Sequence, residues 1–335
     1  VQAGLGLHTD VFQLNGNIRP HSSGRRLEGR LDARGQNFLP LLGRGDYSGL
    51  NLAFDGRTQI SVTKDSVSFS GLSGTLAQAE VSGEGLYTLG PDTGLLSANL
   101  FFDGFDGSAF LPGFEVETGW SNEPMNWALL GRSDADLDLR FRQLKLGRLP
   151  IETARGTFKL RDGVVEAPAL RIQALGAEIL ADLQAEGGDL TPLFNLSARV
   201  SDLQMAAAFE AFYDQPILTA DVDGTLTMRG RGRSAKEMVA SLQGAANFEA
   251  SPGALTFFDL PAMQALRGPQ ADERGRDFER GLGAFTWRDG ILETGITEFV
   301  FASPQHEAEL TSKFNAVTRK LNLDFEERLG LAESE

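Results

Sequence analysis

Apolar and polar residues alternate one by one over many short stretches of this chain, and this pattern constrains the fold more than any other. The segment Asp136–Phe141 reads DLDLRF, so leucine or phenylalanine takes every second position and charged residues stand between. Successive side chains of a strand point to opposite faces of a sheet, so each stretch has one apolar face and one polar face. The sequence therefore predicts a mostly β, antiparallel fold with one face in water. The same alternation recurs over residues 50–54, 218–228 and 321–325.

Asp-Gly turns join several of these stretches into hairpins. Phe158–Glu166, FKLRDGVVE, resembles Phe285–Glu293, FTWRDGILE, and Ile60–Phe69 looks like a degraded copy with Asp-Ser at its turn. Asp-Gly between alternating arms favours a type I′ turn, which needs positive φ at both central residues. Strand-like segments are also repeated, since Leu96–Leu100 recurs as Leu196–Val200, with a weaker copy at Leu27–Leu31. The spacing is uneven, so we expect a reused strand-turn-strand unit rather than a solenoid of one period.

Short helices interrupt the strand pattern. Ser234 stands three residues before Glu237, the spacing of a capping box in which the glutamate reaches back to the amide of Ser234. We predict a helix over Ser234–Leu242, ended by Gly244, and further helix within Phe257–Gly281. The small apolar cluster Ala206–Phe209 is long enough for one or two helical turns.

A family resemblance rests on two segments. Gly230–Leu255, GRGRSAKEMVASLQGAANFEASPGAL, resembles the signature stretch of the AsmA family, in which a strand ending in G-x-G-x-S leads into a short helix, L-x-G and a strand. Phe285–Leu292 is similar to a later strand, turn and strand of that family. We therefore divide the chain into residues 1–130, the N-terminal part of a β-groove, and residues 131–335, an AsmA-like C-terminal region. The boundary falls in Pro112–Ser133, predicted to be a loop or lid.

The resemblance implies an elongated, twisted antiparallel sheet curled into an open apolar groove, with a few short helices. It further implies a non-enzymatic envelope-biogenesis protein of the periplasm of Gram-negative bacteria, anchored to the inner membrane by an N-terminal helix missing from this chain. A phospholipid or other acyl lipid would lie in the groove and pass between inner and outer membrane. Envelope proteins at either membrane are further expected partners.

The residues expected to line the groove are the apolar positions of the clearest alternating stretches. A charge among them would block acyl chains in a lipid-filled groove and would unfold a dry core. These candidates are Leu50, Leu52, Phe54, Val67, Phe69, Leu137, Leu139, Phe141, Leu226 and Met228.

Composition excludes several classes of function. The 335 residues carry a formal net charge of −15 without a Lys/Arg stripe, so we expect no nucleic-acid partner. Cysteine is absent, and the three histidines are scattered, which predicts no thiol chemistry, no metal site and no cofactor. No apolar run approaches the ~20 residues of a membrane helix. An outer-membrane barrel would need girdles of Tyr and Trp, and three of each are too few.

Two alternatives to a lipid groove stay open. The first is a purely structural or interaction β-sandwich that aids outer-membrane assembly, because a dry core needs the same apolar face. The second, more remote, is a haloacid-dehalogenase-like phosphatase, suggested by Asp221-Val222-Asp223-Gly224-Thr225. That motif needs a buried strand in an alternating β/α chain, whereas its flanks read as half-buried strands. Gly230–Lys236 lacks the spacing of a phosphate loop and is better explained as a turn that leads to an N-cap serine.

Overall fold

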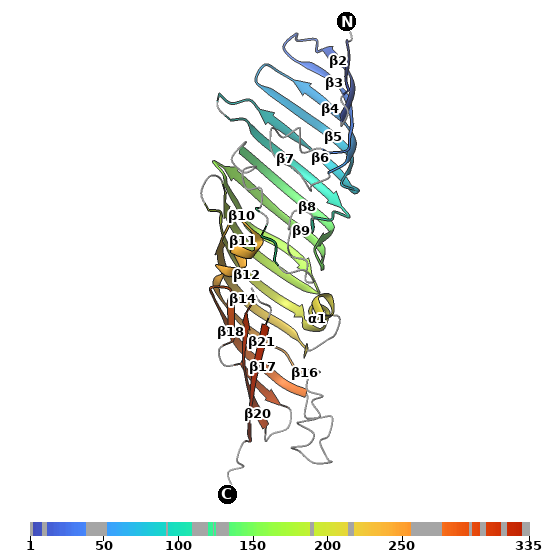
Figure 1. Cartoon of the computed structure of the whole chain (residues 1–335). Helices are drawn as coiled ribbons and strands as arrows, with labels where there is room; N and C mark the ends of the chain where they lie inside the picture. The colour runs from blue at the N-terminus through green and yellow to red at the C-terminus, as the bar shows by residue number, and fades with distance from the viewer. Residues whose placement is uncertain are drawn as a thin grey trace.

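The computed structural model describes residues 3–8, 12–37, 52–91, 93–108, 120–122, 124, 134–187, 191–213, 218–255, 277–294, 297–301, 306–315 and 320–329. In these ranges the chain forms 21 strands of one sheet and two short helices, stacked from the N-terminus at the top of Figure 1 to the C-terminus at its foot. The helices are α1 (Met205–Tyr213) and α2 (Ala235–Ala240). The strands are β1 (Ala3–His8), β2 (Phe12–Pro20), β3 (Leu27–Gly35), β4 (Phe54–Val62), β5 (Ser66–Leu76), β6 (Ala79–Thr88), β7 (Leu95–Asp103), β8 (Asp134–Leu146), β9 (Leu149–Arg161), β10 (Val164–Ala174), β11 (Ala177–Glu186), β12 (Leu193–Gln204), β13 (Leu218–Thr219), β14 (Asp221–Arg231), β15 (Gln243–Ala250), β16 (Gly253–Leu255), β17 (Asp277–Arg288), β18 (Ile291–Thr294), β19 (Thr297–Phe301), β20 (His306–Asn315) and β21 (Lys320–Leu329).

Strands follow one another through the sheet almost in chain order. Each of β1 to β11 pairs with the next strand, β12 pairs with β14, β14 with β15, and β15 with β17. In the described part of the chain, β1 pairs with β2 alone and β21 with β20 alone, so the two lie at opposite ends of an open sheet. The prediction of an elongated, twisted, mostly antiparallel open sheet with short helices is confirmed (Figure 1).

Both predicted Asp-Gly hairpins form. Asp162 and Gly163 join β9 to β10 with φ of 49° and 80°, and Asp289 and Gly290 join β17 to β18 with φ of 51° and 74°. Both pairs have the two positive φ angles that a type I′ turn requires. The third predicted hairpin also forms, between β4 and β5, with Val62 opposite Val67.

One pairing departs from the antiparallel pattern, because β7 and β8 run parallel. A parallel pair needs a connection that returns the chain to the starting edge of the sheet. The predicted loop or lid, 112–133, falls in this connection, and its described part is residues 120–122 and 124. There the Ser121 carbonyl accepts from the Lys236 amide at 3.1 Å. Pro124 forms an isolated antiparallel β-bridge with Ser234. The sheet thus runs unbroken across the proposed domain boundary, and the division into two parts stays a prediction.

The predicted N-cap of α2 is confirmed, and the helix ends earlier than predicted. Ser234 Oγ accepts from the Glu237 amide at 3.2 Å, as the capping box requires, but Glu237 Oε2 accepts from the Arg233 amide at 2.7 Å rather than from that of Ser234. The prediction that Gly244 ends the helix was wrong. Ser241 ends it, because its hydroxyl accepts from the Arg231 amide at 2.7 Å and donates to the Arg231 carbonyl at 2.6 Å, which ties the chain to β14. Gly244 lies in β15.

The two other predicted helical segments have different outcomes. The cluster Ala206–Phe209 lies in α1, so the expected helical turns form there. Most of Phe257–Gly281, namely 257–276, lies outside the described residues. Its last part, from Asp277, belongs to β17, so the predicted helix does not extend to Gly281.

Candidate functional site: the apolar face of the sheet

Cross-strand pairing joins the apolar positions of separate strands into three continuous rows, named here by their residues on β8. Residues directly opposite each other on paired strands share a face. The Leu137 row runs Ala3, Ile18, Gly29, Ile60, Phe69, Gly85, Ala98, Leu137, Phe158. The Leu139 row runs Leu72, Gly83, Leu100, Leu139, Gly156, Leu170, Ala181, Ala198, Leu226, Ala246, Phe285. The Phe141 row runs Val81, Phe102, Phe141, Ala154, Ile172, Ile179, Val200, Gly224, Phe248, Gly283.

The three rows, together called the apolar face, contain no polar or charged side chain. Most of their large side chains between β5 and β9 are half-buried, Phe69, Leu137 and Leu139 among them. Phe102 and Phe141 stack with ring centroids 5.1 Å apart and planes 13° apart, so the aromatic residues pack on one another along the sheet. Large apolar side chains that keep part of their surface exposed in a continuous band mark an interaction surface.

A covered stretch of the apolar side lies farther along the chain, on β14, β15 and β17. Val222, Ala250 and Phe278 form a buried cluster there, with Phe278 only 2% exposed. Met205, the first residue of α1, packs against this cluster together with Leu218. The described part of the sheet therefore combines a half-buried apolar surface with a dry core built on the same side.

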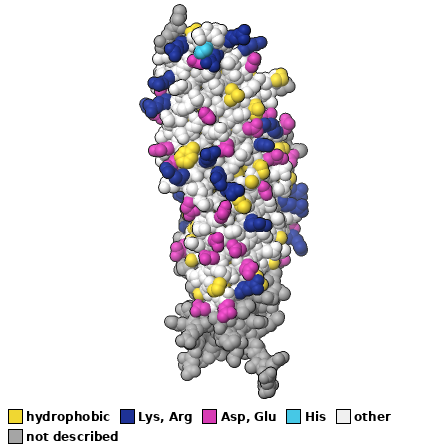
Figure 2. Space-filling view, turned by 180° about the vertical axis from the view of Figure 1, so that it is seen from behind, with side chains coloured by type: hydrophobic (Ala, Val, Ile, Leu, Met, Phe, Trp, Pro, Cys, Tyr) yellow, Lys and Arg dark blue, Asp and Glu magenta, His cyan; other side chains and the backbone are white. Residues whose placement is uncertain are grey.

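The opposite face of the sheet is polar. Figure 2 shows Lys, Arg, Asp and Glu side chains spread along one face of the molecule, with hydrophobic side chains scattered among them. Ion pairs link neighbouring strands on this face, for example Arg34 with Asp55 at 2.6 Å and Arg280 with Glu249 at 3.0 Å. The sheet thus keeps one face wet along its length, as the alternation predicts.

Two arginines on this polar face tie β8 to its neighbours, Arg142 to β7 and Arg161 of β9 to the start of β8. At one end Arg142 pairs with Asp103, its register partner, and donates to that carboxylate. Because this hydrogen bond favours the ionised form, the pKa of Asp103 lies below its ordinary value of 3.8.

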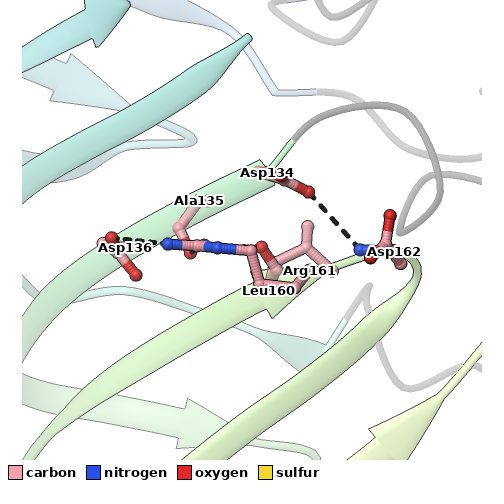
Figure 3. Close-up of polar contacts among 6 residues, drawn as sticks. All are labelled: Asp134, Ala135, Asp136, Leu160, Arg161 and Asp162. Atoms are coloured by element: carbon pink, nitrogen blue, oxygen red, sulfur yellow. Dashed lines mark hydrogen bonds and ion pairs between the residues drawn. The ribbon is translucent and has the colours of Figure 1, made fainter. Parts of the chain in front are cut away.

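At the other end Arg161 holds the start of β8 (Figure 3). Its guanidinium donates to the carbonyls of Ala135 and Leu160, both at 2.8 Å, and to Asp136 Oδ2 at 2.7 Å. The Asp162 amide donates to Asp134 Oδ1 at 3.4 Å. Asp134 and Asp136 therefore tie β8 to β9 and its turn, whereas Asp138 pairs with Arg140 of the same strand. The described residues hold no cluster of acidic or histidine side chains fit for a metal ion.

Most of the predicted groove residues lie in the three rows or beside them. Phe69, Leu137, Leu139, Phe141 and Leu226 belong to the rows. Val67, opposite Tyr87, and Met228, opposite Leu196, extend the same face of β5 and β14. Their role in binding lipid stays a prediction.

Of the remaining three candidates, Phe54 and Leu52 lie at the start of β4. Phe54 is its first residue, and Leu52 is buried just before the strand begins, so it does not continue the strand alternation. Leu50 falls outside the described residues.

Sequence reasoning missed the glycines of the apolar face. Gly83 and Gly85 alternate with polar residues in the segment VSGEGLY and take row positions that a large apolar residue would otherwise fill. Gly156 does the same on β9. The period-two spacing of Gly83 and Gly85 is the signal that could have identified them.

The possible phosphatase motif lies in a different context from the one it needs. Asp221 begins β14, a strand antiparallel to both of its neighbours, β12 and β15, and Asp223 is exposed on the polar face. Asp223 Oδ1 accepts from the Asp202 amide at 2.9 Å, beside the irregularity where β12 shifts register against β14. The two aspartates thus lie in the polar face of a hairpin sheet.

An open twisted sheet with one apolar face defines the structural class of this protein, and comparison with known proteins gives its family. The model of the AsmA family matches residues 115–284, just over half of the chain, so the protein belongs to the AsmA family. No curated protein and no solved structure matches the chain. None of the helices in the described residues has the length and apolar character needed to cross a membrane.

Proposed function

We propose that this chain is a non-enzymatic envelope-biogenesis protein that binds acyl lipid along its apolar face and conducts it between the inner and outer membranes. The observation that carries this proposal is the set of uncharged rows, whose large side chains on β5 to β9 are mostly half-buried. Each methylene that leaves water for such a surface contributes ~0.8 kcal/mol, so a chain of methylenes binds without any specific polar contact.

The length of the rows favours conduction over a single fixed site. The Leu139 row crosses from β5 to β17, and at ~4.8 Å between strands it is roughly 48 Å long. Half of a ~30 Å hydrocarbon core, about 15 Å, is the span of one acyl chain. A lipid therefore has several equivalent positions along the row, and movement from one to the next exchanges similar contacts.

Family membership supports the cellular setting of this proposal. We infer a periplasmic location with an anchor in the inner membrane, a phospholipid or other acyl lipid as ligand, and envelope proteins as further partners. The lipid headgroup would stay in water at the margin of the sheet, because the rows offer it no polar partner.

The covered cluster around Phe278 favours a second candidate, a structural β module of outer-membrane assembly. Such a module would bury its apolar side against its own chain and bind no lipid. Extraction of the purified chain followed by mass spectrometry separates the two. The lipid proposal expects phospholipid in stoichiometric amount, and uptake of fluorescent phosphatidylglycerol from vesicles after the protein has been stripped of lipid. Protein that carries no lipid and takes up none would support the structural module.

A further inference from the structure

Phe69 lies over a glycine of the neighbouring strand. A Cβ built on Gly85 would stand 2.5 Å from Phe69 Cζ and 2.6 Å from Cε1, so the ring occupies the space of the missing side chain. Side chains of a strand ordinarily stand roughly perpendicular to the sheet. Here the ring lies across to β6, the pairing by which an aromatic side chain covers a strand glycine.

The same arrangement occurs at a second place along the apolar face. A Cβ on Gly156 would stand 2.2 Å from Leu170 Cδ2, so this leucine of β10 lies over β9. Leu170 is 9% exposed and belongs to a buried cluster with Ala167 and Ala181. Gly156 has ordinary negative φ, and the nearest atoms to its added Cβ all belong to Leu170, so a substitution there acts through that side chain.

These two pairs lower the apolar surface at separate points. At β5–β6 and at β9–β10 the large side chain thus lies over its glycine neighbour and does not stand perpendicular to the sheet. A branched side chain at either glycine would force the large residue to stand up from the sheet. The change would add methyl groups and no charge.

We propose that Gly85 and Gly156 set the depth of the lipid path by keeping Phe69 and Leu170 flat against the sheet. This inference rests on the proposed lipid function and makes the two glycines determinants of the acyl cross-section that the face accepts. A lipid with two chains needs more depth than a lipid with one. Loss of depth therefore discriminates against the two-chain lipid.

The test compares binding of two lipids by Gly156→Val. Phosphatidylglycerol carries two acyl chains and lysophosphatidylglycerol one, with the same headgroup, and each is offered to protein stripped of lipid. We expect Gly156→Val to weaken the two-chain lipid on the order of tenfold, the equivalent of about two lost methylene contacts, and the one-chain lipid clearly less. Thr157→Val is the matched control, because Thr157 is the next residue and lies exposed on the polar face.

A rescue variant separates depth from damage to the fold. Leu170→Ala removes the side chain that Gly156→Val displaces, so the double variant should regain two-chain binding. Leu170→Ala alone, and Phe69→Ala alone, should raise the ratio of two-chain to one-chain binding, and these variants test the proposal even if Gly156→Val does not fold. An unchanged ratio in all folded variants would overturn the role of the glycines while wild-type binding still supports the lipid function. Absence of binding to wild type would instead refute the proposed function itself.

Discussion

Two pairs of apolar residues on the same sheet side, one pair on β8 and one on β14 and β17, follow the same alternation and differ in burial. Leu137 and Leu139 of the first pair are half-buried, whereas Val222 and Phe278 of the second are 8% and 2% exposed. Val222 and Phe278 share a buried cluster with Ala250, against which Met205 of α1 packs together with Leu203, Leu218, Ala220 and Phe248. Alternation therefore specifies which side of a strand is apolar, and the rest of the fold decides whether that side is a surface or a core.

The largest predicted contrast is between two phenylalanines. Phe278→Ala should lower the free energy of unfolding by ~3–5 kcal/mol, because it leaves a cavity in a packed cluster. Phe69→Ala should cost clearly less, because its ring is half-buried and little packing is lost. Urea denaturation followed by circular dichroism measures both. Equal losses would mean that the two phenylalanines are buried alike and would break the comparison.

A smaller effect is expected at α2, which the chain segment around Ser121 contacts. Ser234→Ala removes the hydroxyl that caps the helix and should cost ~0.5–2 kcal/mol of stability. Ser234→Gly is the control and should cost a few tenths of a kcal/mol, because glycine is tolerated at N-caps. Both variants should bind lipid as wild type does. A strong loss of lipid in Ser234→Ala alone would extend the binding surface to α2.

The smallest effect concerns the parallel junction and depends on pH. The Arg142 hydrogen bond lowers the pKa of Asp103 in the folded protein, so its contribution to stability is fully present above the unfolded pKa and is lost as pH falls through the folded pKa. Asp103→Asn should therefore show a smaller loss of stability than wild type between about pH 5 and pH 2. Urea midpoints across that range test this. Parallel curves for the two proteins would show that the ion pair contributes nothing to folding.

Much of the local structure could be predicted from the sequence, because it depends on neighbouring residues. Alternation identified the apolar sides of β8 and β14, Asp-Gly located two hairpins, and Ser234 with Glu237 located a helix start. These signals act over a few residues. The end of α2 was missed because Ser241 is fixed by β14, ten residues earlier in the chain.

The features that could not be predicted depend on which strands become neighbours. A strand with one apolar side reads the same in parallel and antiparallel pairs, so nothing in β7 or β8 alone indicates their parallel pairing. The position of Phe69 over Gly85 depends on the register of β5 with β6, which the sequence of neither strand alone reveals. The buried cluster of Val222, Ala250 and Phe278 likewise depends on pairing between distant segments, β14 with β15 and β15 with β17.

Leu139→Asp tests the central claim most directly, since Leu139 lies half-buried in the longest row, with row residues on both sides of it. On an open lipid-binding face the new carboxylate can reach water, so the melting temperature should change little, while bound or photo-crosslinked phospholipid is lost because an unpaired charge lies in the path of the acyl chain. Thr225→Asp, on the polar face of β14, should change neither quantity. A large drop in melting temperature for Leu139→Asp, together with no phospholipid on the wild-type protein, would show that the apolar face is a dry core and would contradict the account.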